Sequence, residues 1–414
     1  MSKMTPQIRF QGFTDDWEER KLGDISDVTK LAGFEFTKYV RYQESGKIIA
    51  LRGLNVKNGN LVLDDVKYID DSDFAKLNRS KLYKNDILLT YVGTVGELAI
   101  VPEDNKYFLA PNVARIRLQG HVSPMFVCQM MNDSNFYNRI ILPLIATSSQ
   151  PALSMENVRK FQLLMPDYQE QQKMGAFFKQ LDNNIALHQR KLDLLKEQKK
   201  GFLQKMFPKN GAKVPELRFS GFADDWEERK LGELASVLTG FPFKNEDFVA
   251  NGKYLVITNG NIQNDSSVVD VLLGNRIDDI SDEIKERYYL NKNDILVTMD
   301  GTVGRTAKAV DDNLILAQRV GRLVSNTNPE FVYQWLNHGS FFNEMTKVSH
   351  GGTIKHISVN EISNYRSTVP SNNIEQQKIG AFFKQLDITI DLHQRKLNLL
   401  TEQKKGFLQK MFVS

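Results

Sequence analysis

Two segments of 38 residues, 205 positions apart, are nearly the same sequence, so this chain is a duplicated unit. Residues 170–207 and 375–412 are identical at 32 of 38 positions. A second match opens each half, where RFQGFTDDWEERKLGD at 9–24 returns as RFSGFADDWEERKLGE at 218–233. Between these matches the halves have diverged. Solenoids and propellers repeat every ~20–50 residues, so this much longer period predicts two large domains.

The repeated segments have the heptad pattern of a helix that packs along a partner helix. The first copy places on this seam Met174, Phe178, Leu181, Ile185, His188, Leu192, Leu195, Lys199, Phe202 and Met206, and the second copy repeats the pattern 205 positions later. Proline is absent from both runs. We expect two long helices, each roughly 57 Å at about 1.5 Å per residue. They should form an antiparallel coiled coil that relates the halves by a pseudo-twofold axis.

Two polar positions interrupt the seam. His188 recurs as His393 and Lys199 as Lys404. Polar seam residues fix the register of a helix pair at some cost in stability. We interpret the histidines as seam residues rather than as metal or catalytic groups, because no carboxylate cluster accompanies them.

Residues off the seam recur as well, although the amino acids on the outward face of a helix are normally free to change. The recurring polar residues are Lys173, Gln180, Gln189 and Arg190 in the first copy, and Lys378, Gln385, Gln394 and Arg395 in the second. Recent duplication alone fits poorly, since it would have to spare these segments while the intervening regions diverged. We expect both helices to present one face to two copies of the same partner.

Composition sets the class of protein. With 414 residues, 41% apolar, the chain can bury two ordinary cores. The single cysteine, Cys128, excludes an internal disulfide framework, and neither a signal peptide nor a membrane span is apparent, so we expect a soluble cytoplasmic protein. The repeated segments carry net charges of +4 and +3, which leaves −3 for the remainder. Charge alone therefore does not predict DNA binding by the globular regions.

The regions between the helices combine short β-type runs with turn signals, followed by helical patterns. We expect α+β domains, and divide the chain into region 1–168, helix 169–207, linker 208–217, region 218–373 and helix 374–414. A glycine turn, GTVG, recurs after a strand at 93–96 and 301–304. It is either a structural hairpin turn or a weak phosphate-contacting turn, since it lacks the lysine of a P-loop.

Equivalent positions exchange hydrogen-bonding side chains while the apolar framework persists. Arg52 becomes Thr258, and NVAR at 112–115 becomes RVGR at 319–322. Two domains that share a scaffold but recognise different DNA bases would differ in this way, because arginine hydrogen-bonds well to guanine and asparagine to adenine. Neutral surface drift would look partly similar.

At this point the chain resembles the specificity subunit of type I restriction-modification enzymes, over essentially its whole length. The resemblance rests on W-E-x-R-K-L-G at 17–23 and 226–232, on N-D-I-L-x-T followed by the glycine turn, and on a proline leading into E-Q-Q-K at 170–173 and 375–378. It implies two target-recognition domains that each read half of a bipartite double-stranded DNA sequence. It also implies that the helices dock two methyltransferase subunits, joined by two restriction subunits. S-adenosylmethionine, ATP and magnesium would belong to those partners, with no cofactor on this chain.

On this interpretation the candidate DNA-contacting residues fall on turns and loops of both regions. They are Arg52, Asn55, Tyr91, Gly93, Thr94, Asn112, Arg115, Ser148, Ser149 and Gln150 in the first, and Thr258, Asn259, Asn261, Asp300, Thr302, Arg305, Gln318, Arg319, His350, Thr353, Lys355 and His356 in the second.

Other functional classes fit less well. The sequence lacks an Asn-Pro-Pro-aromatic methyltransferase motif, a P-loop, paired Cys/His metal spacing and a Gly-x-Ser-x-Gly elbow, so we expect a non-catalytic subunit. Asp86 and Asp294 recur but are interpreted as structural caps. A coiled-coil scaffold that bridges two proteins without touching DNA remains the alternative, although it would not explain two domains that diverge at polar surface positions.

Overall fold

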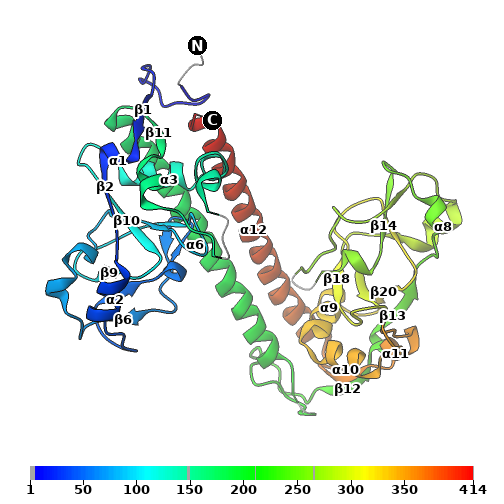
Figure 1. The fold of residues 1–414 in the computed structure, drawn as a ribbon. Helices are drawn as coiled ribbons and strands as arrows, with labels where there is room; N and C mark the ends of the chain where they lie inside the picture. Colours follow the sequence, from blue (N-terminus) through cyan, green and yellow to red (C-terminus); the bar gives the residue numbers. More distant parts are fainter. Residues whose placement is uncertain (1–4, 147–149, 210, 264–265, 414) are drawn as a thin grey trace. The chain divides into compact units, whose positions relative to one another are not determined.

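The computed structural model describes residues 5–146, 150–209, 211–263 and 266–413, which divide into two compact units (Figure 1). Unit 1 comprises residues 1–188 and 396–414, and unit 2 comprises residues 189–395. Each unit therefore contains one globular region and part of both long helices, α6 (Tyr168–Met206) and α12 (Asn373–Met411). Among the described residues, no helix is long and apolar enough to cross a membrane.

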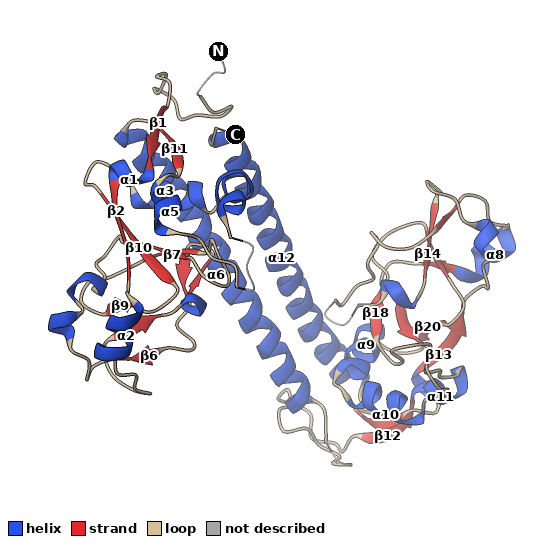
Figure 2. Cartoon of the chain, viewed as in Figure 1, coloured by secondary structure: helices blue, strands red, loops and turns tan. Residues whose placement is uncertain are grey.

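Unit 1 mixes short strands with short helices, as Figure 2 shows. Its strands are β1 (Glu18–Lys21), β2 (Ser26–Lys30), β3 (Ile49–Leu51), β4 (Val56–Lys57), β5 (Asn60–Leu61), β6 (Lys67–Tyr68), β7 (Ile87–Thr90), β8 (Leu98–Ile100), β9 (Tyr107–Leu109), β10 (Val113–Leu118) and β11 (Gln162–Met165). Its short helices are α1 (Leu22–Ile25), α2 (Gly33–Tyr39), α3 (Pro124–Met131), α4 (Ser134–Phe136) and α5 (Met155–Arg159).

Unit 2 repeats this order of elements with local changes. Its strands are β12 (Glu227–Lys230), β13 (Ala235–Thr239), β14 (Tyr254–Ile257), β15 (Arg276–Ile277), β16 (Tyr289–Leu290), β17 (Ile295–Thr298), β18 (Thr306–Lys308), β19 (Leu314–Leu316), β20 (Val320–Ser325) and β21 (Arg366–Val369). Its short helices are α7 (Leu231–Leu234), α8 (Asp282–Tyr288), α9 (Pro329–Asn337), α10 (Ser340–Val348) and α11 (Val359–Ser363).

The main sheet is the same in both units. It is antiparallel, with strand order β2-β10-β7-β8 in unit 1 and β13-β20-β17-β18 in unit 2. A second sheet differs, with three strands (β6-β3-β9) in unit 1 and four (β15-β14-β19-β16) in unit 2. Each contains one parallel pair, β3 with β9 in unit 1, where β9 is an edge strand, and β14 with β19 at the centre of the sheet in unit 2. The α+β architecture predicted from the sequence is confirmed.

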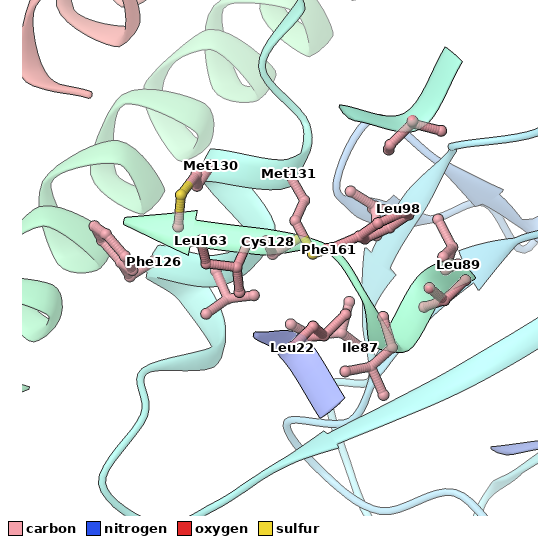
Figure 3. Close-up of a cluster of buried hydrophobic side chains, with 14 of the residues drawn as sticks. Leu22, Ile87, Leu89, Leu98, Phe126, Cys128, Met130, Met131, Phe161 and Leu163 are labelled. Atoms are coloured by element: carbon pink, nitrogen blue, oxygen red, sulfur yellow. The ribbon is translucent and has the colours of Figure 1, made fainter. Parts of the chain in front are cut away.

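The main sheet is packed against helices by a cluster of buried apolar side chains. In unit 1, Figure 3 shows strand residues such as Leu89 and Leu98 in the same cluster as Cys128 and Met131 of α3. Burial raises the pKa of the Cys128 thiol to about 12, so this cysteine is a small core residue and not a nucleophile at neutral pH.

The long helices pair antiparallel within each unit. In unit 1, Phe177 of α6 packs edge-on against Phe407 of α12 with ring centroids 5.1 Å apart, and in unit 2 Phe202 packs against Phe382 at the same distance. The ion pairs agree, since Asp182 meets Lys404 in unit 1 and Lys199 meets Asp387 in unit 2. Within a unit the α12 number falls as the α6 number rises. The predicted antiparallel pairing is confirmed.

The two polar seam lysines belong to a buried network that the sequence did not reveal. Lys404 Nζ lies 2.6 Å from Asp182 Oδ1, while Gln129 of α3 donates to Asp182 Oδ2 at 2.6 Å. Unit 2 has the same arrangement, with Lys199 and Gln334 of α9 on the two oxygens of Asp387. Each network joins both long helices to the globular part of its unit.

The opening segments are fixed to the helices by a second pair of repeated contacts. Arg9 donates from Nε and Nη2 to both oxygens of Glu170 at 2.8 Å, and Arg218 pairs in the same way with Glu375. Both glutamates are almost completely buried. A planar fork matched to a carboxylate is the strongest form of such a pair, which explains why both residues recur in the duplication.

Candidate nucleic-acid interface

Three segments that are distant in sequence meet at the ends of the main-sheet strands. In unit 1, the backbone of Tyr91 just after β7 donates to Asn112 O at 3.0 Å and accepts from Leu153 N at 2.8 Å. Gly93 N also donates to Pro151 O at 3.0 Å. The glycine turn, the turn before β10 and the loop before α5 therefore form one surface.

Unit 2 builds the same surface from equivalent segments. Met299 N donates to Arg319 O at 3.0 Å, Ile357 N donates to Met299 O at 2.9 Å, and Gly301 N donates to Lys355 O at 2.8 Å. We call these two surfaces the strand-end surfaces: residues 91–96, 111–112 and 150–153 in unit 1, and 299–304, 318–319 and 350–357 in unit 2.

Half of the candidate residues are exposed, and the rest are half-buried, buried or outside the described residues. The exposed candidates are Gly93, Thr94, Asn112 and Gln150 in unit 1 and Thr258, Thr302, Gln318, Arg319, His350, Thr353 and Lys355 in unit 2. Half-buried candidates are Arg52, Asn259, Asp300, Arg305 and His356, and buried ones are Asn55, Tyr91, Arg115 and Asn261. Ser148 and Ser149 lie outside the described residues.

Asn55 and Asn261 were expected to face DNA, but the structure places both in the interior. The Asn55 amide accepts from Arg52 N and donates to the carbonyls of Val62 and Asp65. Asn261 accepts from Thr258 N and also donates to two carbonyls. A buried amide with all these bonds made holds a loop in place, so in this conformation neither side chain is available to a base.

Two of the candidate arginines are also engaged internally. Arg115 in β10 is buried, pairs with Asp27 and donates to Arg79 O at 3.1 Å. Its equivalent in β20, Arg322, pairs with Asp294 at 2.9 Å, so the recurrence of this arginine has a structural cause. Arg52 pairs with Asp65 at 2.8 Å and keeps 21% of its side chain exposed.

The glycine turns are tight hairpin connections. Gly96 N donates to Thr90 O at 2.9 Å, and Gly304 N to Thr298 O at the same distance. Gly93 and Gly301 have φ of 80° and 72°, which glycine adopts without strain. Because the glycine N–H groups are used within the turn or on the neighbouring loop, the geometry favours the structural interpretation over a phosphate cradle.

The unit 2 surface carries a charged cluster. Asp300 accepts from His356 Nδ1 at 2.7 Å and from Arg319 Nη1 at 2.5 Å. Partial burial alone would raise the pKa of Asp300, but the hydrogen bonds from His356 and Arg319 outweigh it and lower the pKa below the usual aspartate value. The carboxylate is therefore ionised at neutral pH and holds two basic side chains from two other segments.

Sequence reasoning missed one cation beside the unit 1 surface. Lys30 at the end of β2 lies opposite Ala114 of β10, and its Nζ is 5.0 Å from the centre of the Tyr91 ring. Nothing in the sequence indicated this contact, because it depends on a strand pair separated by more than 80 residues.

The helices expose a second candidate surface. Leu187 and Leu194 of α6 are 50% and 55% exposed, and their equivalents Leu392 and Leu399 of α12 are 64% and 51% exposed. A seven-residue spacing puts each pair on one side of its helix, away from the buried seam residues. We call these two pairs the outer leucines; they are absent from the set expected from the sequence, which considered only polar residues.

The predicted partner-binding residues on the helices divide into two groups. Lys173 lies over the ring of Phe13 at 4.7 Å, and Lys378 over Phe222 at 5.0 Å, so these two lysines have an internal reason to recur. The exposed polar residues Gln180, Gln189, Arg190, Gln385 and Arg395 lie along the helix surfaces, and Gln394 is half-buried. Among the described residues, no group of three or more His, Cys, Asp or Glu side chains is placed to hold a metal ion.

Comparison with known proteins agrees with this arrangement. The family model of the type I restriction modification DNA specificity domain matches twice, at residues 14–197 and 223–402. The MjaVIII specificity subunit of a type I restriction enzyme from Methanocaldococcus jannaschii is 23% identical and covers 95% of this chain and 91% of its own length. A putative MjaX specificity subunit from the same organism is 20% identical over 95% of this chain and 92% of its own.

A solved structure shares the fold. The crystal structure of a type I restriction-modification system S subunit from M. genitalium superimposes with a TM-score of 0.68 at 14% identity, covering 99% of this chain and all of that one. The duplicated sequence, the repeated main sheet and two family matches that together span most of the residues lead to one assignment. The chain belongs to the family of type I restriction-modification DNA specificity proteins.

Proposed function

We propose that this chain directs a type I restriction-modification complex to a bipartite DNA sequence. The strand-end surface of each unit reads one half of the target in double-stranded DNA. Catalysis belongs to the methyltransferase and restriction subunits, which bring S-adenosylmethionine, ATP and magnesium. One observation carries the proposal: the same three-segment surface occurs twice with different hydrogen-bonding side chains, such as Asn112 in one unit and Arg319 in the other.

The long helices serve two further roles in this proposal. As one antiparallel pair they set the separation of the half-sites, and their outer faces dock two methyltransferase subunits. The outer leucines support this docking, because exposed leucines retained in both copies suit an apolar contact with a partner. Two similar faces on one chain suit two copies of one partner.

The decisive experiment maps methylated bases in a methylation-free host that carries this chain with its cognate methyltransferase subunit, or either alone. A split motif methylated on both strands only when both are present supports the proposal. A stable complex that leaves no motif, and gives no protection of DNA, would overturn it in favour of a protein scaffold.

Docking is tested by placing charge on the outer leucines. Leu187→Glu with Leu392→Glu should abolish co-purification of the methyltransferase subunit, since a carboxylate in an apolar contact leaves a desolvated charge. Leu272→Glu, at a leucine that is 93% exposed outside the helices, is the matched control. Unchanged co-purification with the helix variants would place the partner elsewhere.

A further inference from the structure

One side chain on the strand-end surface of unit 2 adopts a backbone conformation that its residue type disfavours. Seven non-glycine residues have positive φ in the described part of the chain, and six of them are asparagines. The seventh is Arg319, with φ of 70°, at the position where unit 1 has Asn112 with the same φ. Asparagine tolerates this left-handed region, whereas arginine does so at a cost. Strain of this kind is maintained where the side chain has a task.

The guanidinium of Arg319 is oriented by a carboxylate from another segment. Nη1 lies 2.5 Å from Asp300 Oδ2, and the other oxygen, Oδ1, accepts from His356 Nδ1 at 2.7 Å. The three residues come from the three segments of the strand-end surface. The described residues of unit 1 form no such cluster, because Val92 and Ala152 occupy the positions of Asp300 and His356.

The pair with Asp300 uses only one edge of the guanidinium. Nε and Nη2 form the side-on fork with two parallel N–H groups, which is the geometry that Arg9 uses on both oxygens of Glu170. Within the described residues, Nε and Nη2 of Arg319 make no hydrogen bond, and the side chain is 58% exposed. A preordered fork therefore faces solvent with two donors.

The ligand that fits such a fork must present two adjacent acceptors. In the major groove, guanine offers N7 and O6 as an acceptor pair, whereas adenine offers one acceptor beside a donor. A phosphate would also accept from the fork, but it requires no fixed orientation and would not explain a strained backbone supported by two further residues. The chemistry favours a base edge.

We propose that Arg319 reads a guanine in the half-site recognised by unit 2, and that Asp300 and His356 are positioning residues that aim its guanidinium. This inference rests on the function proposed above and deepens it, since it assigns one base contact to one side chain. Loss of a good bidentate contact lowers discrimination between the right and wrong base about 10- to 100-fold.

The test uses the complete methyltransferase complex and short duplexes that carry every base pair at each position of the unit 2 half-site. The wild-type complex should require a G·C pair at one position. Arg319→Asn installs the residue that unit 1 has at the same φ, so folding should be preserved. Its methylation rate should lose the preference at that one position, about 10- to 100-fold, while the unit 1 half-site keeps its full specificity.

The positioning role has its own readout. Asp300→Ala should lower discrimination at the same base pair only, and Asp300→Asn should recover part of it, since its amide oxygen still accepts from Arg319. A fall that is equal for every sequence would instead give Asp300 a purely structural role. Lys355→Ala, at an exposed cation of the same surface, is the control and should weaken methylation uniformly.

Three results would overturn the inference. A wild-type half-site without a G·C pair would do so, as would an Arg319→Asn complex with unchanged base preference. In both cases the split motif itself would leave the proposed function standing. If the wild-type complex gives no motif at all, the proposed function fails first and the base assignment falls with it.

Discussion

Unit 1 and unit 2 agree in what lies beneath their surfaces and differ in what lies on them. Both have the same four-stranded main sheet, and in both a Gln-Asp-Lys network joins a short helix, α3 or α9, to the two long helices. At the strand ends, however, unit 1 has Val92, Asn112 and Ala152 at the positions where unit 2 has Asp300, Arg319 and His356. The comparison teaches that a framework fixed by buried contacts can carry exchangeable side chains at one edge.

The largest effect is expected from breaking the buried network. Asp387→Ala should lower the free energy of unfolding by about 3–5 kcal/mol, because it leaves the Lys199 ammonium without its carboxylate and removes one of the two acceptors of Gln334. Asp182→Ala should cost less, since the Asp182 side chain is 19% exposed and that of Asp387 only 9%. Urea denaturation measures both.

The matched control for these variants is Asp391→Ala. Asp391 pairs with Arg395 on the helix surface, and unit 1 already has alanine there, at position 186. Surface pairs contribute about 0–1 kcal/mol. Equal losses from all three substitutions would contradict the idea that each network stabilises the packing within its own unit.

The glycine turns should respond unequally to an added methyl group. Gly304→Ala combines positive φ with a Cβ 2.8 Å from Met345 Cβ, and should cost about 2–4 kcal/mol of stability. Gly96→Ala should cost a similar amount, because at positive φ its new Cβ lies 2.6 Å from the partly buried ring of Tyr137.

Gly93→Ala and Gly301→Ala are the controls, since a Cβ there meets nothing within 4 Å. They should cost only the strain of positive φ, about 1–2 kcal/mol. Thermal unfolding of the four variants gives the order, and identical shifts in Tm would show that space beside the turn is irrelevant.

A transplant would sharpen the comparison of the two surfaces. Asn112→Arg in unit 1 should cost about 1–2 kcal/mol of stability, because arginine replaces asparagine at positive φ. With Val92→Asp added, the guanidinium gains the carboxylate that unit 2 supplies from Asp300.

Methylation of base-substituted duplexes should show a new G·C preference in the unit 1 half-site for the double variant. Asn112→Arg alone should show a weaker one. A single variant as selective as the double would mean that Asp300 does not position Arg319.

The smallest effect concerns a half-buried histidine of unit 2, His338. His338 packs on Phe207 with ring centroids 5.0 Å apart and interacts with Trp335 O and Ser340 Oγ. Burial lowers its pKa, although the bond to Trp335 partly opposes this. Unit 1 has Asp133 at the equivalent position.

Because the folded state resists protonation of His338, the unfolded state takes up the extra proton as pH falls below about 6.5. The stability of the wild-type protein should therefore decline as pH falls from 7 to 5. The stability of the His338→Asn variant should decline less over the same range. The difference in Tm between the two proteins across this range measures the effect, and parallel curves would contradict it.

Local patterns accounted for much of the molecule before its structure. Seven-residue periodicity predicted both long helices, and lysines at two seam positions marked where polar contacts interrupt the seam. Exchange of Asn112 for Arg319 pointed to the surface that differs between the units. These signals can be recognised in the sequence alone because helix periodicity and turn chemistry depend on residues that are close together in the chain.

Other features could not be foreseen. Asn55 and Arg115 looked like candidate base contacts, yet both serve the interior, because burial depends on which distant segments cover a residue. The outer leucines were missed because only polar residues were considered off the seam, and their exposure depends on what covers that face of each helix.

The sequence by itself determined that the chain is a duplication, that each half ends in a long helix and that polar surface residues diverge on a common framework. Only the tertiary structure decided that Asp300, Arg319 and His356 meet, that Asp182 and Asp387 receive the seam lysines, and which leucines stay exposed. The physical reason is one of range. Repeats and periodicity lie along the chain, whereas a strand-end surface forms only when the ladder of a sheet brings together segments up to about 60 residues apart.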